Sequence, residues 1–243
     1  MSDAYGQFKG QRKKNILLLC EHAWPNLPEE YDNLGLDKEA IYSHYGWDIG
    51  AFDVFQKIAQ DLEASGIYSK ISRLLVDSNR RPHAPDLIRK ELEHGNPIPG
   101  NQNITLEERE KRIRKYWKPY HDALENAILS FGEEKPILIA VHSFTPVLNG
   151  EVREMDIGLL YYPPFLDSYL ISKEIGDSLA KRGYHVEYNK PYSVENPEPY
   201  PIHYYAEKYG LSYVALEINN RLIGVKKDAV KVGADLALLL KSL

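Results

Sequence analysis

The sequence predicts a single α/β domain in which a mostly parallel, mixed sheet is flanked by helices. Short apolar runs alternate with helix-period patterns along the 243 residues, which is typical of α/β proteins. Several of the apolar runs are nearly continuous, as expected for strands that are buried on both faces of a parallel sheet. No break in composition and no Ser/Gly-rich linker divides the chain, so we expect one domain over residues 15–243.

The first elements follow a polar amino terminus. Residues 1–14 are polar and basic, and we expect a flexible tail there rather than a signal peptide. The apolar run over residues 15–20 predicts the first strand. Apolar side chains then recur at helical spacing over residues 49–62, with Gly66 available as the stop signal. Residues 69–76 are expected to form the second strand.

The remaining elements continue the alternation. A long helical pattern covers residues 106–129, and Pro119 predicts a kink or break within it. The Pro-dense residues 191–201 are expected to form a surface loop. The other predicted elements are strands over residues 136–141, 156–162, 184–188 and 212–216, and helices over residues 169–182 and 229–240.

Composition excludes several classes of function. The formal net charge of −5 and the sequence pI near 5.9 argue against non-specific nucleic-acid binding. The mean hydropathy is −0.45, and no apolar run approaches the roughly 18 residues that a membrane span needs. Cys20 is the only cysteine, which excludes an intrachain disulfide and a cysteine-cluster metal site. We expect a cytoplasmic protein without nucleic-acid or membrane partners.

Polar side chains follow the predicted strands, where each apolar run ends. In open α/β sheets, ligands bind beyond the carboxyl ends of the strands. We therefore expect these residues to meet at one edge of the sheet. They are Glu21 and His22, the segment from Asp77 to Arg80 that includes Asn79, His142 and Ser143, Asn189, and Glu217.

Taken singly, most of these residues have a structural explanation as well as a functional one. A histidine at a strand end is more often a loop hydrogen-bonding group than a ligand, and Asp48 lies where an N-cap is expected. Glu217 follows an apolar run, and a carboxylate in such dry surroundings favours function. Two histidines and a carboxylate form the usual hydrolytic zinc site. The spacing signature His-Glu-x-x-His is absent, so spacing alone identifies no metal.

A series of motifs in one order along the chain carries a resemblance to a known family. In these motifs the chain resembles the N-formylglutamate amidohydrolase family over nearly its whole length. The motifs are Cys-Glu-His-Ala at 20–23, Trp-Asp-Ile-Gly-Ala at 47–51, Ser-Arg-Leu at 72–74, Asp-x-Asn-Arg at 77–80, Pro-Tyr-His at 119–121, His-Ser-Phe-Thr-Pro at 142–146, Asp-Ile-Gly-Leu-Leu at 156–160, Asn-x-Pro-Tyr at 189–192 and Glu-Ile at 217–218.

The resemblance implies a fold similar to the zinc carboxypeptidases, of the phosphorylase/hydrolase-like type. It also implies one zinc ion per chain and hydrolysis of an amide bond in N-formylglutamate or a related small N-acyl amino acid. By position, the resemblance assigns His22, Asp48 and His142 as zinc ligands. Glu21 is the substitute ligand if Asp48 is only a helix cap.

The same resemblance assigns the remaining roles. Glu217 matches the general base that acts on zinc-bound water, and the pair Asn79 and Arg80 matches a substrate clamp. A guanidinium fork suits bidentate contact with a carboxylate. Further residues of matching motifs are expected to line the substrate pocket: Arg73, Tyr120, His121, Arg153, Asn189 and Tyr192.

The sequence departs from the family pattern at two positions. Asn219 stands where an arginine is expected after Glu-Ile, and Trp24 stands where a small polar residue is expected. These departures leave the acyl substrate open, and the oligomeric state is not predicted. The alternative functions are a zinc peptidase or cell-wall-type amidase of the same fold, and a non-catalytic binding protein.

Overall fold

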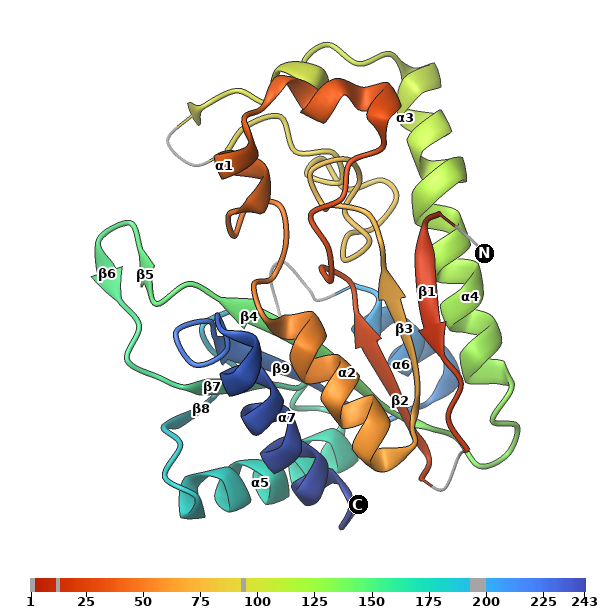
Figure 1. The fold of residues 1–243 in the computed structure, drawn as a ribbon. Coiled ribbons are helices and arrows are strands. Elements are labelled where there is room, and N and C mark those ends of the chain that lie inside the picture. The colour runs from red at the N-terminus through yellow and green to blue at the C-terminus, as the bar shows by residue number, and fades with distance from the viewer. Residues whose placement is uncertain (1–2, 12–13, 93–94, 193–199) are drawn as a thin grey trace.

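A seven-stranded mixed sheet forms the centre of the molecule, with helices on both of its faces (Figure 1). The computed structural model describes residues 3–11, 14–92, 95–192 and 200–243. The strand order is β1-β3-β2-β4-β9-β7-β8, and the predicted α/β class is confirmed. The strands are β1 Tyr5–Phe8, β2 Ile16–Cys20, β3 Ser65–Ser69, β4 Ile137–Phe144, β7 Ile157–Leu160, β8 Val186–Tyr188 and β9 Tyr213–Asn219.

The helices join these strands and cover the sheet. Searched over the described residues, no helix combines the length and apolar character that crossing a membrane requires. A small hairpin, β5 Val147–Leu148 and β6 Glu151–Val152, extends beyond β4. The helices are α1 Lys38–Tyr42, α2 Ala51–Leu62, α3 Leu106–Arg112, α4 Lys118–Leu129, α5 Leu166–Lys181, α6 Ile202–Tyr209 and α7 Lys226–Leu240.

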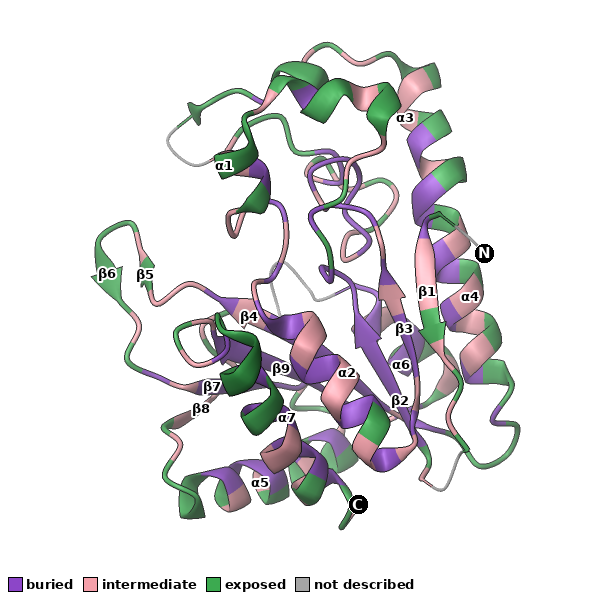
Figure 2. Cartoon of the chain, in the orientation of Figure 1, coloured by how far each residue is buried: buried purple, intermediate pink, exposed green. Residues whose placement is uncertain are grey.

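Alternation along the buried strands divides the core between the two faces of the sheet. In β2, Leu18 and Cys20 face the cluster formed with α2 and α7, whereas Leu17 and Leu19 face the cluster formed with α4 and α6. Period-two alternation explains this division, since successive side chains point to opposite faces. Every residue of β2 is buried (Figure 2), as its continuous apolar run predicts.

Strand direction decides which strand ends meet. Strands β3, β2, β4 and β9 run parallel to one another, so their carboxyl ends lie at one edge. Strand β7 is antiparallel to β9, and β8 is parallel to β7. The expectation that Asn189 meets the others at that edge is therefore wrong, because Asn189 follows β8 and leaves the sheet at the opposite end.

Two predicted boundaries also differ from the structure. Within the expected tail, Tyr5–Phe8 form the edge strand β1, which pairs antiparallel with β3. The second strand covers Ser65–Ser69 rather than residues 69–76. Gly66 does not stop α2 but lies inside β3, where an added Cβ would be 2.7 Å from the Phe55 ring. The close approach of helix and strand, rather than a helix end, explains this glycine.

The long helical pattern is interrupted as expected. Helix α3 runs into a π-helical turn over Ile113–Trp117, and α4 follows from Lys118. Pro119 is the second residue of α4 and directly follows the π-helical turn, so the change in helix geometry lies next to the proline. Of the predicted loop over residues 191–201, residues 193–199 lie outside the described part.

Candidate metal centre and active site

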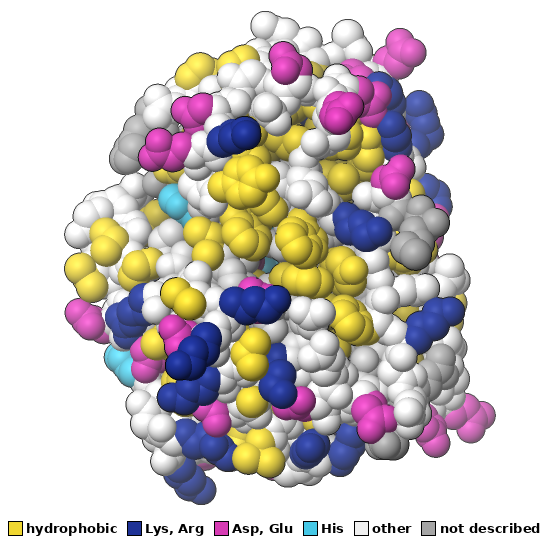
Figure 3. Space-filling view, in the orientation of Figure 1, with side chains coloured by type: hydrophobic (Ala, Val, Ile, Leu, Met, Phe, Trp, Pro, Cys, Tyr) yellow, Lys and Arg dark blue, Asp and Glu magenta, His cyan; other side chains and the backbone are white. Residues whose placement is uncertain are grey.

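A pocket of about 270 Å³ lies at the carboxyl ends of the parallel strands. It is lined mainly by polar side chains. On the face of the molecule shown in Figure 3, apolar side chains lie across the middle, and charged groups of both signs surround them. The described residues that line the pocket are His22, His44, Tyr45, Asp48, Arg73, Asn79, Arg80, Arg89, His142, Ser143, Phe144, Thr145, Leu148, Leu160, Tyr192 and Glu217.

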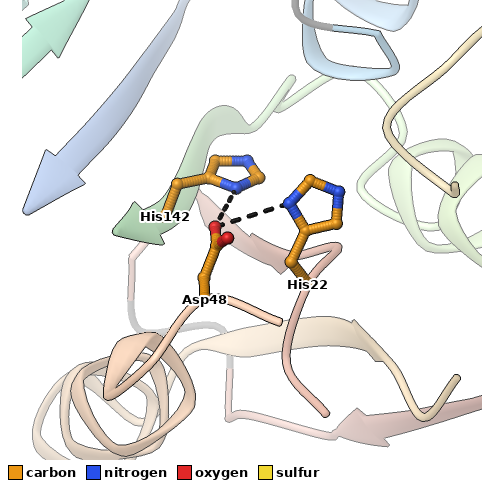
Figure 4. Close-up of side chains that lie close together, drawn as sticks. All are labelled: His22, Asp48 and His142. Atoms are coloured by element: carbon orange, nitrogen blue, oxygen red, sulfur yellow. Dashed lines mark hydrogen bonds and ion pairs between the residues drawn. The ribbon is translucent and has the colours of Figure 1, made fainter. Parts of the chain in front are cut away.

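Three buried side chains in this pocket converge on one point (Figure 4). Asp48 Oδ2 lies 2.9 Å from His142 Nδ1 and 3.4 Å from His22 Nδ1. One potential ligand atom from each residue lies within 4.8 Å of the other two. Two imidazoles and a carboxylate at this spacing are a donor set that suits a divalent metal such as zinc.

Backbone contacts hold this donor set in place. The Asp48 N–H donates to the His22 carbonyl at 3.0 Å, and the Ser143 N–H donates to Asp48 Oδ2 at 3.2 Å. Gly50, and not Asp48, is the N-cap residue of α2. Its φ is +81°, and an added Cβ would be 2.1 Å from the Ile223 carbonyl oxygen. The Trp-Asp-Ile-Gly motif therefore turns the chain so that Asp48 faces the histidines.

A second carboxylate supports each histidine from behind. His22 Nε2 lies 2.8 Å from Asp77 Oδ1, and His142 Nε2 lies 3.1 Å from Glu21 Oε2. With the proton on Nε2, each imidazole has a lone pair on Nδ1 that can bind a metal, and the lone pair of His22 here faces the Arg73 guanidinium. Burial lowers the pKa of His22, but the carboxylates of Asp77 and Asp48 outweigh it and raise the pKa overall. The two imidazoles and the carboxylate, held by these contacts, form a donor set that fits a metal ion.

Removing either supporting carboxylate is expected to weaken metal binding. Asp77→Asn and Glu21→Gln should each lower zinc affinity about 10- to 100-fold, because the histidines lose their orienting partners. Competition with a chelator of known affinity measures this change. The exposed Asp122→Asn, on the solvent side of α4, serves as the control. Wild-type affinity in both test variants would contradict the assigned support.

Glu217 lies next to this donor set through strand pairing. In the parallel ladder of β4 and β9, His142 is the register partner of Glu217, so both side chains lie on the same face. The Glu217 side chain is buried, and its Oε2 has no hydrogen-bond partner among the described residues. Burial raises the pKa of Glu217 to about 7. A carboxyl group in this environment is suited to gaining and losing a proton near neutral pH.

Arginines form another part of the pocket lining. Arg73 Nη1 lies 3.3 Å from Asp48 Oδ1 and 3.2 Å from His22 Nδ1, so positive charge already lies against the candidate ligands. Its Nε also donates to the Tyr45 carbonyl at 3.0 Å. Arg80 Nε donates to Asp86 Oδ2 at 2.7 Å. The structure thus brings both arginines into the pocket.

Asn79 and Tyr192 also reach the pocket, by different routes. The N–H of Asn79 donates to Asp77 Oδ1 at 2.8 Å, which ties the Asp-x-Asn-Arg motif to the carboxylate behind His22. Tyr192 follows Asn189, whose left-handed φ of +53° turns the chain back. The Asn189 side chain accepts a hydrogen bond from the Tyr161 N–H. Asn189 itself is not among the described residues that line the pocket.

Three further predicted residues are not among the described residues that line the pocket. Tyr120 is fully buried in α4. His121 stacks on Trp117, with ring centroids 3.7 Å apart, and its Nε2 lies 3.1 Å from the Ser78 carbonyl oxygen. Arg153 lies over the rings of Phe144 and Tyr192. Their role in substrate binding stays a prediction.

Buried His121 is expected to make the fold sensitive to acid. Burial lowers the pKa of His121 from 6.5 to about 3, so below pH 6.5 the unfolded chain takes up a proton that the folded chain refuses. Stability is then lost as the pH falls from 6.5 towards 3. Between pH 7.5 and pH 5 this residue should cost about 2 kcal/mol of unfolding free energy.

Urea unfolding of the wild type and His121→Gln at both pH values tests this loss. The variant loses ring packing at every pH, so the pH-dependent difference is the informative quantity. The loss of unfolding free energy between the two pH values should be about 2 kcal/mol smaller in the variant than in the wild type. Equal differences in the two proteins would contradict a buried, neutral His121.

Sequence reasoning missed Arg89, and the two departures from the family pattern, Trp24 and Asn219, are not among the described residues that line the pocket. Arg89 lines the pocket but belongs to none of the motifs quoted above. Trp24 packs against Phe52, with ring centroids 5.0 Å apart, and does not line the pocket beside the ligands. Asn219 is buried and donates to the Arg153 and Met155 carbonyls. Cys20 is fully buried in the core, and burial raises its pKa, so the thiol is not an activated nucleophile.

The chain is similar to known proteins over most of its length. A sequence model of the N-formylglutamate amidohydrolase family matches residues 14–224. A gene product of Agrobacterium tumefaciens with a crystal structure is 30% identical, with a TM-score of 0.90 over 98% of this chain and 94% of that chain. An N-formylglutamate amidohydrolase from Ralstonia eutropha JMP134 is similar in fold, at 17% identity and a TM-score of 0.64 over 98% and 96% of the two chains. No curated protein matches the chain.

Proposed function

The chain belongs to the N-formylglutamate amidohydrolase family, and we propose that it is a zinc-dependent enzyme that hydrolyses the amide bond of N-formylglutamate or a related small N-acyl amino acid. The observation that carries this proposal is the buried set His22, Asp48 and His142 with Glu217 beside it. A base next to a metal donor set in a pocket of small volume suits the hydrolysis of a small amide.

The zinc ion would be held by His22 Nδ1, His142 Nδ1 and Asp48. When bound, zinc polarises an acyl carbonyl and makes water more acidic. Three protein ligands leave a coordination position for water or substrate. Asp77 and Glu21 then act as supports that fix the two imidazole rings.

Glu217 serves as the general base in this proposal. It removes a proton from the attacking water and afterwards delivers that proton to the leaving amine. Burial favours the neutral carboxyl form that the second transfer requires. The unpartnered Oε2 gives the carboxyl an atom that is free to make these transfers.

Arg80, with Asn79, serves as the substrate clamp. The Asp86 carboxylate orients the Arg80 guanidinium from one side, and a fixed guanidinium binds a carboxylate through two parallel hydrogen bonds. Arg73 lies against the Asp48 carboxylate and places further positive charge where a tetrahedral oxyanion would develop. Such charge stabilises the transition state more than the neutral ground state.

Zinc analysis combined with a formate assay tests the proposed function. The purified protein should contain about one zinc ion per chain, as one donor set of this kind predicts, and should release formate from N-formylglutamate. Removal of zinc should abolish release, and added zinc should restore it. Zinc without release from N-formylglutamate or other N-acyl amino acids would contradict the substrate class. Activity that is independent of zinc would contradict the mechanism.

A further inference from the structure

The exposed side of the pocket carries a guanidinium group that the proposed mechanism does not use. Arg89 lines the pocket and is solvent-exposed, whereas the candidate metal ligands are buried. Among the residues that the structure describes, no carboxylate forms an ion pair with Arg89. Arg73 and Arg80 are both paired, with Asp48 and Asp86. Arg89 is thus the pocket arginine whose charge is left for a ligand.

Charges of both signs lie near Arg89. Desolvation lowers its pKa, and repulsion from Arg73 and Arg80 lowers it further, against weaker attraction from Asp77 and Asp86. Asp77 is already engaged with His22. Because Asp48 and Asp86 already pair with Arg73 and Arg80, Arg89 is the guanidinium of this pocket that a further anion would neutralise. The pocket is therefore suited to a substrate with more than one negative charge.

Two other nearby arginines, Arg153 and Arg221, are not among the described residues that line the pocket. Asn219 occupies the place where the family pattern suggests an arginine, and its side chain holds the carbonyls of Arg153 and Met155. Arg221 is paired with Asp156. Arg153 packs on aromatic rings and is not among the described residues that line the pocket. Of these side chains, Arg89 is the one that brings an unengaged guanidinium to the pocket.

We propose that Arg89 binds the second carboxylate of a dicarboxylic N-acyl amino acid and determines the preference of this pocket for acidic over neutral substrates. The proposal rests on the proposed function. Arg80 then holds the carboxylate nearer the scissile amide, and Arg89 holds the distal one. The burial of the two arginines supports this assignment of the two carboxylates, because Arg80 is half-buried and Arg89 is exposed.

Binding of two simple carboxylates tests the proposal without relying on turnover. Glutarate has two carboxylates and butyrate has one, and titration calorimetry on the zinc-loaded protein measures the Kd of each. In Arg89→Met, the Kd for glutarate should rise at least about tenfold, as loss of a charged hydrogen bond predicts. The Kd for butyrate should stay unchanged. Arg89→Lys should recover part of the glutarate affinity, since the charge remains.

Steady-state kinetics provide the second measurement. Arg89→Met should raise KM for N-formylglutamate about tenfold or more, while kcat/KM for N-formylalanine stays within about twofold of the wild type. Arg114→Met is the matched control, because Arg114 is exposed and outside the described lining. Arg114→Met removes the same charge and should leave KM and kcat/KM unchanged for both substrates.

The outcomes separate this inference from the proposed function. If the wild type hydrolyses neither substrate but glutarate binding still depends on Arg89, the proposed function fails and the anion subsite stands. If glutarate affinity and KM are the same in Arg89→Met as in the wild type, the inference is overturned. A selective loss of glutarate binding in Arg153→Met, with none in Arg89→Met, overturns it as well and assigns the subsite to Arg153.

Discussion

Replacing Glu217 by glutamine is expected to lower kcat for amide hydrolysis by roughly 1,000-fold, within the range that loss of a general base costs. Glutamine keeps the size and burial of the side chain but cannot take a proton from water. Because Glu217 is not in the metal donor set, zinc content should remain that of the wild type. Formate release and zinc analysis on the same preparation measure both quantities.

The matched control is Glu207→Gln, which makes the same change at an exposed position of α6. It should leave kcat unchanged. Two results would contradict the role of Glu217. One is wild-type kcat in Glu217→Gln, and the other is a loss of zinc large enough to explain the lost activity.

Replacing His142 by alanine is expected to remove both zinc and activity. His142 Nδ1 lies 2.9 Å from Asp48 Oδ2, and loss of the imidazole leaves two of the three proposed ligands. Zinc affinity should fall by more than the roughly 100-fold that loss of a supporting group costs. Chelator competition measures affinity, and the formate assay measures activity.

His185→Ala removes an exposed imidazole and should keep both zinc and activity. Because His142 is buried, its loss also creates a small cavity, so circular dichroism on each variant shows whether the fold remains. Asp48→Asn serves as a second variant that keeps side-chain volume. Full zinc binding in both folded variants would contradict the donor set.

Much of the fold could be predicted because buried strands have a strong local signature. The run over residues 15–20 is apolar without interruption, and β2 follows it closely. Edge strand β1 could not be predicted in this way, since a half-exposed strand of four residues depends on pairing with β3. The reversed direction of β7 and β8 is also a property of tertiary structure. No local pattern reports it, which is why Asn189 was misplaced.

The candidate site, like the fold, could be predicted only in part from the sequence. Family motifs predicted His22, Asp48 and His142, and the structure brings these three together. Asp77 was expected at the edge of the sheet, but nothing in the sequence shows that its carboxylate faces Nε2 of His22. Arg89 lies in no quoted motif, and only the folded pocket reveals its position. Support and specificity come from long-range packing, whereas the donor set has a sequence signature.

Neighbouring strands of a sheet lie about 4.8 Å apart in nearly all proteins. The spacing between His142 and Glu217 is therefore inherited from the β4–β9 ladder rather than from side-chain packing. Arg89 and Tyr192, by contrast, come from segments outside the sheet, and such segments tolerate substitution and insertion. Selection can therefore alter which substrate is accepted while the reaction chemistry stays intact.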